Sequence, residues 1–171
     1  VFIRQVELRE LRMRLLHPFE TSFGATQDRH IVLVRATDGT HNGYGEVTAA
    51  EGPFYNQETW ETAWHVLRDY IIPLIVGKTF DPAEFGPFVR SIRGHNMAKA
   101  GVETALWDLD AKIQSIPLWK HLGGTREAVE CGVSIGIQPS IDQLIGKIDR
   151  EVNAGYRRIK IKIKPGWDVD V

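Results

Sequence analysis

The residues that could do chemistry gather in one stretch near the end of the chain, residues 157–168. Lys160, Lys162 and Lys164 alternate there with isoleucines. Because the side chains of a β-strand point to alternate faces, Lys160 and Lys162 share one face and the isoleucines share the other. An amine is almost wholly protonated at neutral pH, so it can act as a base only where burial or a nearby positive charge lowers its pKa. Lys160 could supply that charge to Lys162, which makes the pair a candidate for general acid–base catalysis.

The same pattern has a simpler interpretation, a half-solvated edge strand, and the spacing alone leaves both open. Residues 129–135 predict a strand, residues 140–154 an amphipathic helix and residues 158–163 a second strand. This succession makes the strands parallel, with the helix covering one face. The lysine face then points into an interior or a site, and in a closed barrel Lys162 would lie at the catalytic end. Lys164 directly precedes a proline, so we expect it to leave the strand as a solvated charge.

The chain ahead of this unit predicts an α+β domain. Alternating apolar residues and turn residues predict a three-stranded antiparallel meander, with strands at residues 2–14, 29–38 and 44–48. Apolar spacing and capping residues predict helices from an N-cap at Asn56 to a stop at Gly77, from Asp81 to about residue 92, and over residues 96–114. The composition changes near Thr125 from helical to alternating strand and helix. We therefore expect one domain over residues 1–125 and a second region over residues 126–171.

Two predicted loops carry aromatic residues where polar residues are usual. Phe19 and Phe23 lie in the loop of residues 17–24, and Tyr55 ends the loop of residues 49–55. Exposed aromatic side chains in loops invite a functional explanation, although such rings can also pack back on their own domain.

The composition limits the classes of function. Lys and Arg total 21 against 22 Asp and Glu, so no net field attracts nucleic acid or an anionic membrane. No apolar stretch reaches the length of a membrane span, and a single cysteine, Cys131, cannot form an internal disulfide. We expect a cytoplasmic protein without nucleic-acid or membrane partners, in which Cys131 is a buried thiol. The histidines show no metal-ligand spacing, so no metal ligand is assigned in the chain.

The Lys-x-Lys segment resembles the second barrel strand of the muconate-lactonizing subgroup of the enolase superfamily. Further segments that resemble this subgroup follow in the same order along the chain, at residues 18–24, 43–46, 96–100, 107–109 and 132–138. The set covers nearly the whole chain and looks most like the branch that contains o-succinylbenzoate synthases and N-succinylamino acid racemases. The resemblance implies an α+β capping domain, made of the meander and a helical bundle, followed by the first βαβ unit of a TIM-type (β/α) barrel.

The chemistry that the resemblance implies is abstraction of a proton next to a carboxylate. The product is an enediolate held on a divalent metal, Mg²⁺ or another. Lys162 would be one acid/base, and Lys160 would lower its pKa and attract the carboxylate of a small-molecule substrate. The residues that would contact this substrate are Ser134, at the end of the first barrel strand, and the loop residues Phe19, Phe23 and Tyr55, which would close over its apolar acyl or aryl group.

An eight-fold barrel takes ~250 residues, far more than follow Thr125. The resemblance therefore implies that the metal ligands and a second catalytic lysine lie beyond Val171 and that the 171-residue chain alone is inactive. We expect the full-length enzyme to be a homo-oligomer, with menaquinone biosynthesis as the setting of a synthase activity. A dipeptide epimerase or a muconate cycloisomerase of the same subgroup is an alternative. Another is a non-catalytic interaction module, in which a free capping domain binds a partner through an exposed strand edge.

Overall fold

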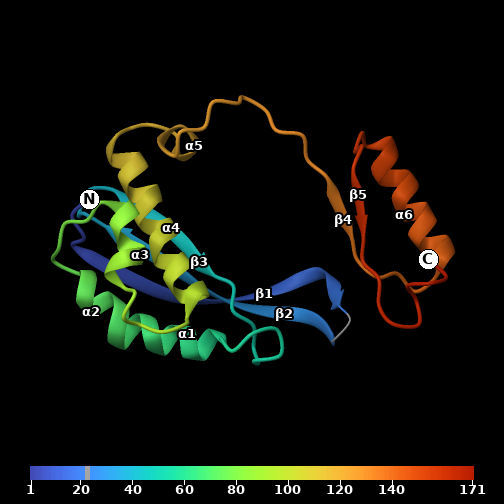
Figure 1. The fold of residues 1–171 in the computed structure, drawn as a ribbon, viewed down its shortest axis with the longest axis horizontal. Helices are drawn as coiled ribbons and strands as arrows, with labels where there is room; N and C mark the ends of the chain where they lie inside the picture. The colour runs from blue at the N-terminus through green and yellow to red at the C-terminus, as the bar shows by residue number, and fades with distance from the viewer. Residues whose placement is uncertain (22–23) are drawn as a thin grey trace. The chain divides into compact units, whose positions relative to one another are not determined.

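The computed structural model describes residues 1–21 and 24–171. These residues form two compact units. The first unit comprises Val1–Met13 and Asp28–Thr125, and the second comprises Arg14–Gln27 and Arg126–Val171. Figure 1 shows the elements of both in chain order. Because residues 14–21 belong to strand β1 and residues 24–27 to strand β2, these two strands contribute to both units.

A three-stranded sheet has the order β1-β2-β3, with β1 at Gln5–Thr21, β2 at Gly24–Thr37 and β3 at Asn42–Val47. Strands β2 and β3 pair antiparallel, from Val32 opposite Val47 to Thr37 opposite Asn42. The turn between them is held by Asp38, whose Oδ1 accepts bonds from the backbone N–H of Thr40 at 2.7 Å and of His41 at 2.6 Å. The predicted meander is therefore confirmed.

The loop predicted over residues 17–24 is wrong for the residues that the structure describes. Strand β1 continues to Thr21 and β2 begins at Gly24, while Ser22 and Phe23 lie outside the described residues. The segment contains Pro18, which cannot donate a ladder hydrogen bond. However, β1 is an edge strand, and an edge strand tolerates proline where its N–H would face away from the sheet.

The first helical segment comprises α1 (Trp60–Val66), a π-helical turn (Leu67–Ile71) and α2 (Ile72–Ile75). Its N-cap is Thr59, and the prediction of Asn56 is wrong. Thr59 Oγ1 accepts from Thr62 N, while Thr62 Oγ1 accepts from Thr59 N, so the two threonines form a reciprocal capping box. Asn56 instead accepts a bond from Glu58 N at 2.8 Å. The predicted stop is confirmed, since Gly77 takes the positive φ of 80° that ends the segment.

The next helix begins as predicted and ends early. Asp81 Oδ1 accepts from Ala83 N at 3.0 Å, ahead of a 3₁₀ turn (Pro82–Glu84) and α3 (Phe85–Phe88). The helix stops before the predicted end at residue 92, because Gly86 and Pro87 are poor helix formers. Two further helices complete the unit, α4 (Asn96–Ile113), which matches its prediction closely, and α5 (Leu118–His121).

Helix α4 lies directly against strand β3, backbone to backbone. A Cβ atom added to Gly43 would stand 2.1 Å from Ala105 O, and one added to Gly45 would stand 2.0 Å from Gly101 O. Only glycine fits at these two positions. The contact is completed by Asp108, whose Oδ2 accepts from the backbone N–H of Tyr44 at 2.8 Å. Gly43 and Gly45 are thus explained by close packing of strand β3 against helix α4.

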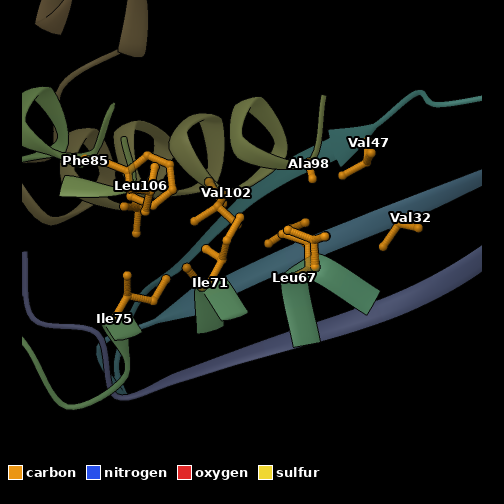
Figure 2. Packing of buried hydrophobic residues seen from close by; sticks show 14 of the residues in the cluster. Val32, Val47, Leu67, Ile71, Ile75, Phe85, Ala98, Val102 and Leu106 are labelled. Atoms are coloured by element: carbon orange, nitrogen blue, oxygen red, sulfur yellow. The ribbon is translucent and has the colours of Figure 1, made fainter. Parts of the chain in front are cut away.

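The core of the first unit fills the space between this sheet and its helices. Figure 2 shows side chains of the π-helical turn and α2 meeting those of α4, with Val32 and Val47 of the sheet beside them. Leu67, Ile71 and Leu106 have no exposed surface. A fully buried aliphatic side chain contributes about 1.5–3 kcal/mol, so this cluster is the main source of the unit's stability.

The second unit contains the predicted parallel βαβ arrangement: β4 (Val133–Ile135), α6 (Ile141–Asn153) and β5 (Ile159–Ile161). Ser140 caps α6 by accepting from Gln143 N at 3.2 Å. Helix α6 packs against β4, as Figure 1 shows in orange and red. Both strands are shorter than predicted. Cys131, expected to be buried, is exposed, because it precedes β4 in a segment without regular structure.

Candidate functional site

The register of the parallel pair sets the candidate site. Ser134 of β4 stands opposite Lys160 of β5, and the backbone N–H of Lys162 donates to Ile135 O at 3.0 Å. Lys162 directly follows β5, and this bond continues the ladder by one residue. By strand alternation, Ser134, Lys160 and Lys162 project from the face opposite to Ile135. Ile135 is fully buried, and Leu144 of α6 is only 3% exposed. The lysine side chains therefore occupy the face that the helix does not cover, as the sequence predicted.

The end of strand β1, residues 19–21, contacts Lys162 within the second unit and is called the hairpin tip below. Lys162 Nζ lies 3.4 Å from the centroid of the Phe19 ring. The ring itself is half exposed, at 50%. Phe19 thus lies at the candidate site, beside the lysine that the sequence singles out as an acid/base.

A second contact of the hairpin tip corrects one prediction. Lys164 was expected to be a solvated charge, but its Nζ lies 2.8 Å from Glu20 Oε1, and both side chains are about two-fifths exposed, at 39% and 41%. Lys164 lies three residues after the end of β5, so strand alternation does not fix the direction of its side chain. Its partner could not be found from spacing, because the two residues are far apart in the chain. Exposed ion pairs of this kind stabilise by less than about 1 kcal/mol, so the pair matters for position more than for stability.

The electrostatics of Lys162 fit a base. Partial burial lowers the pKa of its ammonium from the usual value, and the positive charge of Lys160 lowers this pKa further. Burial is the larger cause, whereas the sequence interpretation gave first place to Lys160. The aromatic face of Phe19 acts in the opposite sense, because a ring quadrupole attracts the charged form.

Tyr55, the remaining predicted contact, belongs to the first unit and is exposed at 71%. Its loop is held at the base by Glu51, whose carboxylate lies 2.6 Å from His30 Nδ1 and accepts from Trp60 Nε1 at 3.1 Å. The sequence analysis missed this anchor, because His30 lies in β2, far from the loop along the chain. Phe23 lies outside the described residues.

No metal site is assigned within residues 1–21 and 24–171. These residues contain no group of three or more His, Cys, Asp or Glu side chains arranged to hold a metal ion. They therefore do not fit the divalent metal that the resemblance implies. In the same part of the chain, no helix is long and apolar enough to cross a membrane.

This combination of elements defines a class of protein. A three-stranded antiparallel sheet with packed helices, followed by a parallel βαβ unit with Lys-x-Lys on its second strand, is the capping domain and first barrel segment of the enolase superfamily. Residues 3–123 match the model of the mandelate racemase / muconate lactonizing enzyme N-terminal domain, so the chain belongs to this family. The predicted fold class and the resemblance are both confirmed.

Individual relatives within the superfamily are similar to the chain over almost its whole length. The o-succinylbenzoate synthase of Geobacillus kaustophilus is 50% identical over 171 residues, and the N-succinylamino acid racemase of Thermus thermophilus is 43% identical over 170 residues. Each match covers 99% of this chain and 46% of the relative. A solved structure of an enolase-superfamily member from Listeria innocua superposes with a TM-score of 0.91 at 33% identity, again over 99% of this chain and 46% of that one. The chain thus spans about half the length of the relatives it matches, all of which belong to a superfamily of enzymes.

Proposed function

We propose that this chain works within an enzyme of its relatives' length that removes a proton from the carbon next to a carboxylate. The product of that step is an enediolate. The overall reaction would be that of an o-succinylbenzoate synthase, an N-succinylamino acid racemase or both, since relatives with these names are 50% and 43% identical. In this proposal residues 1–125 form the capping domain and residues 126–171 form the first part of the catalytic barrel. The enzyme is proposed to work in the cytoplasm.

Lys162 is the proposed acid/base. Proton abstraction near neutral pH needs an amine whose pKa lies below its usual value, so that a useful fraction is neutral. The observation that carries the proposal is the position of Lys162 directly after β5, where its N–H bonds to Ile135 O at 3.0 Å and Lys160 precedes it by two residues. Burial and the charge of Lys160 lower the pKa of Lys162 there. Lys160 has a second role, because its charge attracts the substrate carboxylate.

The other site residues are proposed to bind the substrate. Ser134 projects beside Lys160 and can donate or accept a hydrogen bond with a polar group of the substrate. Phe19, Phe23 and Tyr55 are proposed to enclose the apolar acyl or aryl group and to exclude water. Selection among acyl groups would come from these aromatic residues.

The divalent metal would supply positive charge to the enediolate oxygens. Its ligands are proposed to lie outside this chain, because the described residues provide none. The steps assigned to this chain involve only its own residues, which bind the substrate, exclude water and move one proton at Lys162 Nζ.

Proton exchange on separate enantiomers tests the proposal. A racemase that passes through a planar enediolate needs one base on each face, and Lys162 would serve one of them. In the full-length enzyme, Lys162→Ala should abolish racemisation of an N-succinylamino acid in both directions. It should leave exchange of the α-hydrogen with deuterated solvent for one enantiomer only, as followed by NMR. Racemisation at a near wild-type rate would show that Lys162 is not the acid/base.

Two controls sharpen this test. In Lys160→Ala both enantiomers should still exchange, but more slowly and with the pH profile moved upward, because loss of the neighbouring charge raises the pKa of Lys162. A polypeptide limited to residues 1–171 should show no magnesium-dependent racemisation, since the proposed second base and the metal ligands are absent from it.

A further inference from the structure

The tip of the β1–β2 hairpin meets the segment around β5 at two adjacent points. Phe19 lies against Lys162, and its neighbour Glu20 pairs with Lys164. The first contact joins a ring to an ammonium, and the second joins a carboxylate to an ammonium. Two contacts from consecutive residues restrict the position of the tip more than either could alone.

The contact of Phe19 with Lys162 is unusually close for this chain. Its distance from Nζ to ring centroid is 3.4 Å, whereas the other lysine–ring contacts among residues 1–21 and 24–171 span 5.0 to 5.2 Å. Cation–π attraction operates within about 6 Å of the centroid and grows when the cation is partly shielded from water. Lys162 is partly buried, so its contact meets both conditions.

The ring has two opposite effects on the lysine. As an apolar group it excludes water, which disfavours the ammonium. As a quadrupole with a negative face it favours the ammonium. An aliphatic side chain of similar bulk would keep the first effect and lose the second, so the two can be separated by substitution.

We propose that Phe19 is a positioning residue for Lys162, whose ring face holds the ammonium protonated and in place while the Glu20–Lys164 ion pair anchors the hairpin tip. The inference rests on the proposed acid–base role of Lys162. In this racemisation Lys162 would remove the α-proton of one enantiomer as a base and, in the reverse direction, return a proton as an acid. The ring favours the acid form, whereas Lys160 on the same strand face favours the base. Glu20 and Lys164, the other charged groups nearby, neutralise each other.

The test is a direct titration of Lys162 in the full-length protein. Lysine labelled with ¹⁵N at Nζ gives one resonance per side chain, and the Lys162→Met variant identifies the one of interest. Phe19→Leu should lower the pKa of Lys162 by about half a unit, the shift that corresponds to a typical cation–π contact. The matched control is Phe88→Leu, which removes the ring that contacts Lys78 at 5.0 Å and should leave Lys162 unchanged.

Fluorinated phenylalanines at position 19 separate the quadrupole from bulk. One, two and three fluorines weaken the negative ring face in steps with little change in size, so the pKa of Lys162 should fall in steps. The pH profile of proton exchange for the enantiomer that Lys162 serves should move downward in parallel. An unchanged or raised pKa in Phe19→Leu, or no trend with fluorine, would overturn the proposal, because the ring would then act only by excluding water.

A double-mutant cycle tests the anchor. If the ion pair holds the tip in place, Phe19→Leu should shift the pKa of Lys162 less in a Glu20→Gln background than in the wild type. Additive shifts would overturn the anchoring role of Glu20. All of these titrations are made without substrate. A Phe19-dependent pKa in an enzyme whose Lys162→Ala variant still racemises would refute the proposed function while leaving the contact's effect on Lys162 intact.

Discussion

The two units of the chain differ in how much core they contain. The first unit holds a continuous cluster of buried side chains from β2, β3 and α1 to α4, against which Val6 and Leu8 of β1 pack partly buried. In the described part of the second unit, the buried hydrophobic residues are Ile135, Ile137 and Leu144. Nevertheless, the second unit carries the lysines. The candidate chemistry therefore lies on the part of the chain that local packing stabilises least.

The surface of the second unit shows the same contrast. Ile161 and Ile163 of the apolar face are 36% and 55% exposed, and Val169 is 92% exposed. Apolar strand surface of this kind is normally covered by a neighbouring element. The geometry of Lys160 and Lys162 thus depends on packing beyond the local βαβ unit, whereas the first unit supplies its own.

The same substitution in both units would break or confirm this contrast. Leu106→Ala in the first unit should cost about 2–5 kcal/mol, because the cavity is enclosed by a rigid core. Leu144→Ala in the second unit should cost less, since few buried side chains surround it. Urea unfolding combined with hydrogen exchange resolved by unit measures both. Equal losses in the two variants would contradict the difference in core.

A buried carboxylate should account for much of the position of α4. Helix α4 has no side-chain cap of its own, since the preceding His95 adopts φ 51° without such a bond. Glu58, 3% exposed, accepts instead from the backbone N–H groups of Met97 and Ala98 at 3.0–3.1 Å. Glu58→Ala should destabilise the first unit by about 1.5–3 kcal/mol, because it leaves buried donors unpaired. The control Glu61→Ala, at an exposed position, should have little effect in the same unfolding measurement, and similar losses in both would argue against the cap.

The aromatic loop residues should affect selection and leave proton transfer intact. Replacing Phe23 or Tyr55 by Ala in the full-length enzyme should reduce kcat/KM for apolar acyl substrates. The reduction should correspond to about 1–3 kcal/mol of lost transition-state binding, the range for lost apolar pocket contacts. Tyr70→Ala, at another exposed aromatic position, should leave the acyl preference unchanged. Steady-state kinetics with a series of acyl groups distinguishes the outcomes. A uniform loss across the series would mean that these residues are structural.

The smallest expected effect lies in the turn before β3. Bonds from the backbone of His41 and Thr40, together with the His41 side chain, lower the pKa of Asp38 to about 2. Because this folded-state pKa is below the unfolded one, the contribution is present above about pH 4 and is lost as the pH falls through about 2. We expect it to stay under about 1 kcal/mol, since the turn is solvated. Asp38→Asn should therefore lower stability at neutral pH and converge with the wild type in acid, and a constant gap would refute this.

Sequence reasoning worked where local pattern decides the structure. The order of elements, the extent of α4 and the parallel pairing of β4 with β5 all follow from periodicity and connection length. It failed where two local solutions compete, as for Asn56 and Thr59, both of which are good cap residues. Only the reciprocal bond of Thr59 with Thr62 favours the second, and its energy depends on geometry.

The candidate site was predictable in part for a related reason. The alternation of Lys160 and Lys162 on one strand face is a short-range property and was visible in the residues. The contact with Phe19 and the pairing of Glu20 with Lys164 depend on how distant segments meet. Cys131 was misplaced because a cysteine is usually buried, yet the segment before β4 offers no layer to cover it.

The glycine contact between β3 and α4 has a mechanical consequence. Since Gly45 and Gly101 let two backbones touch, no layer of side chains lies between them that could rearrange under load. Proteins unfold under hydrostatic pressure because internal voids are eliminated, and a seam of directly packed backbone contains almost none. Under pressure, the side-chain core around Leu106 should therefore rearrange first. The contact between β3 and α4 should be the least compressible part of the first unit.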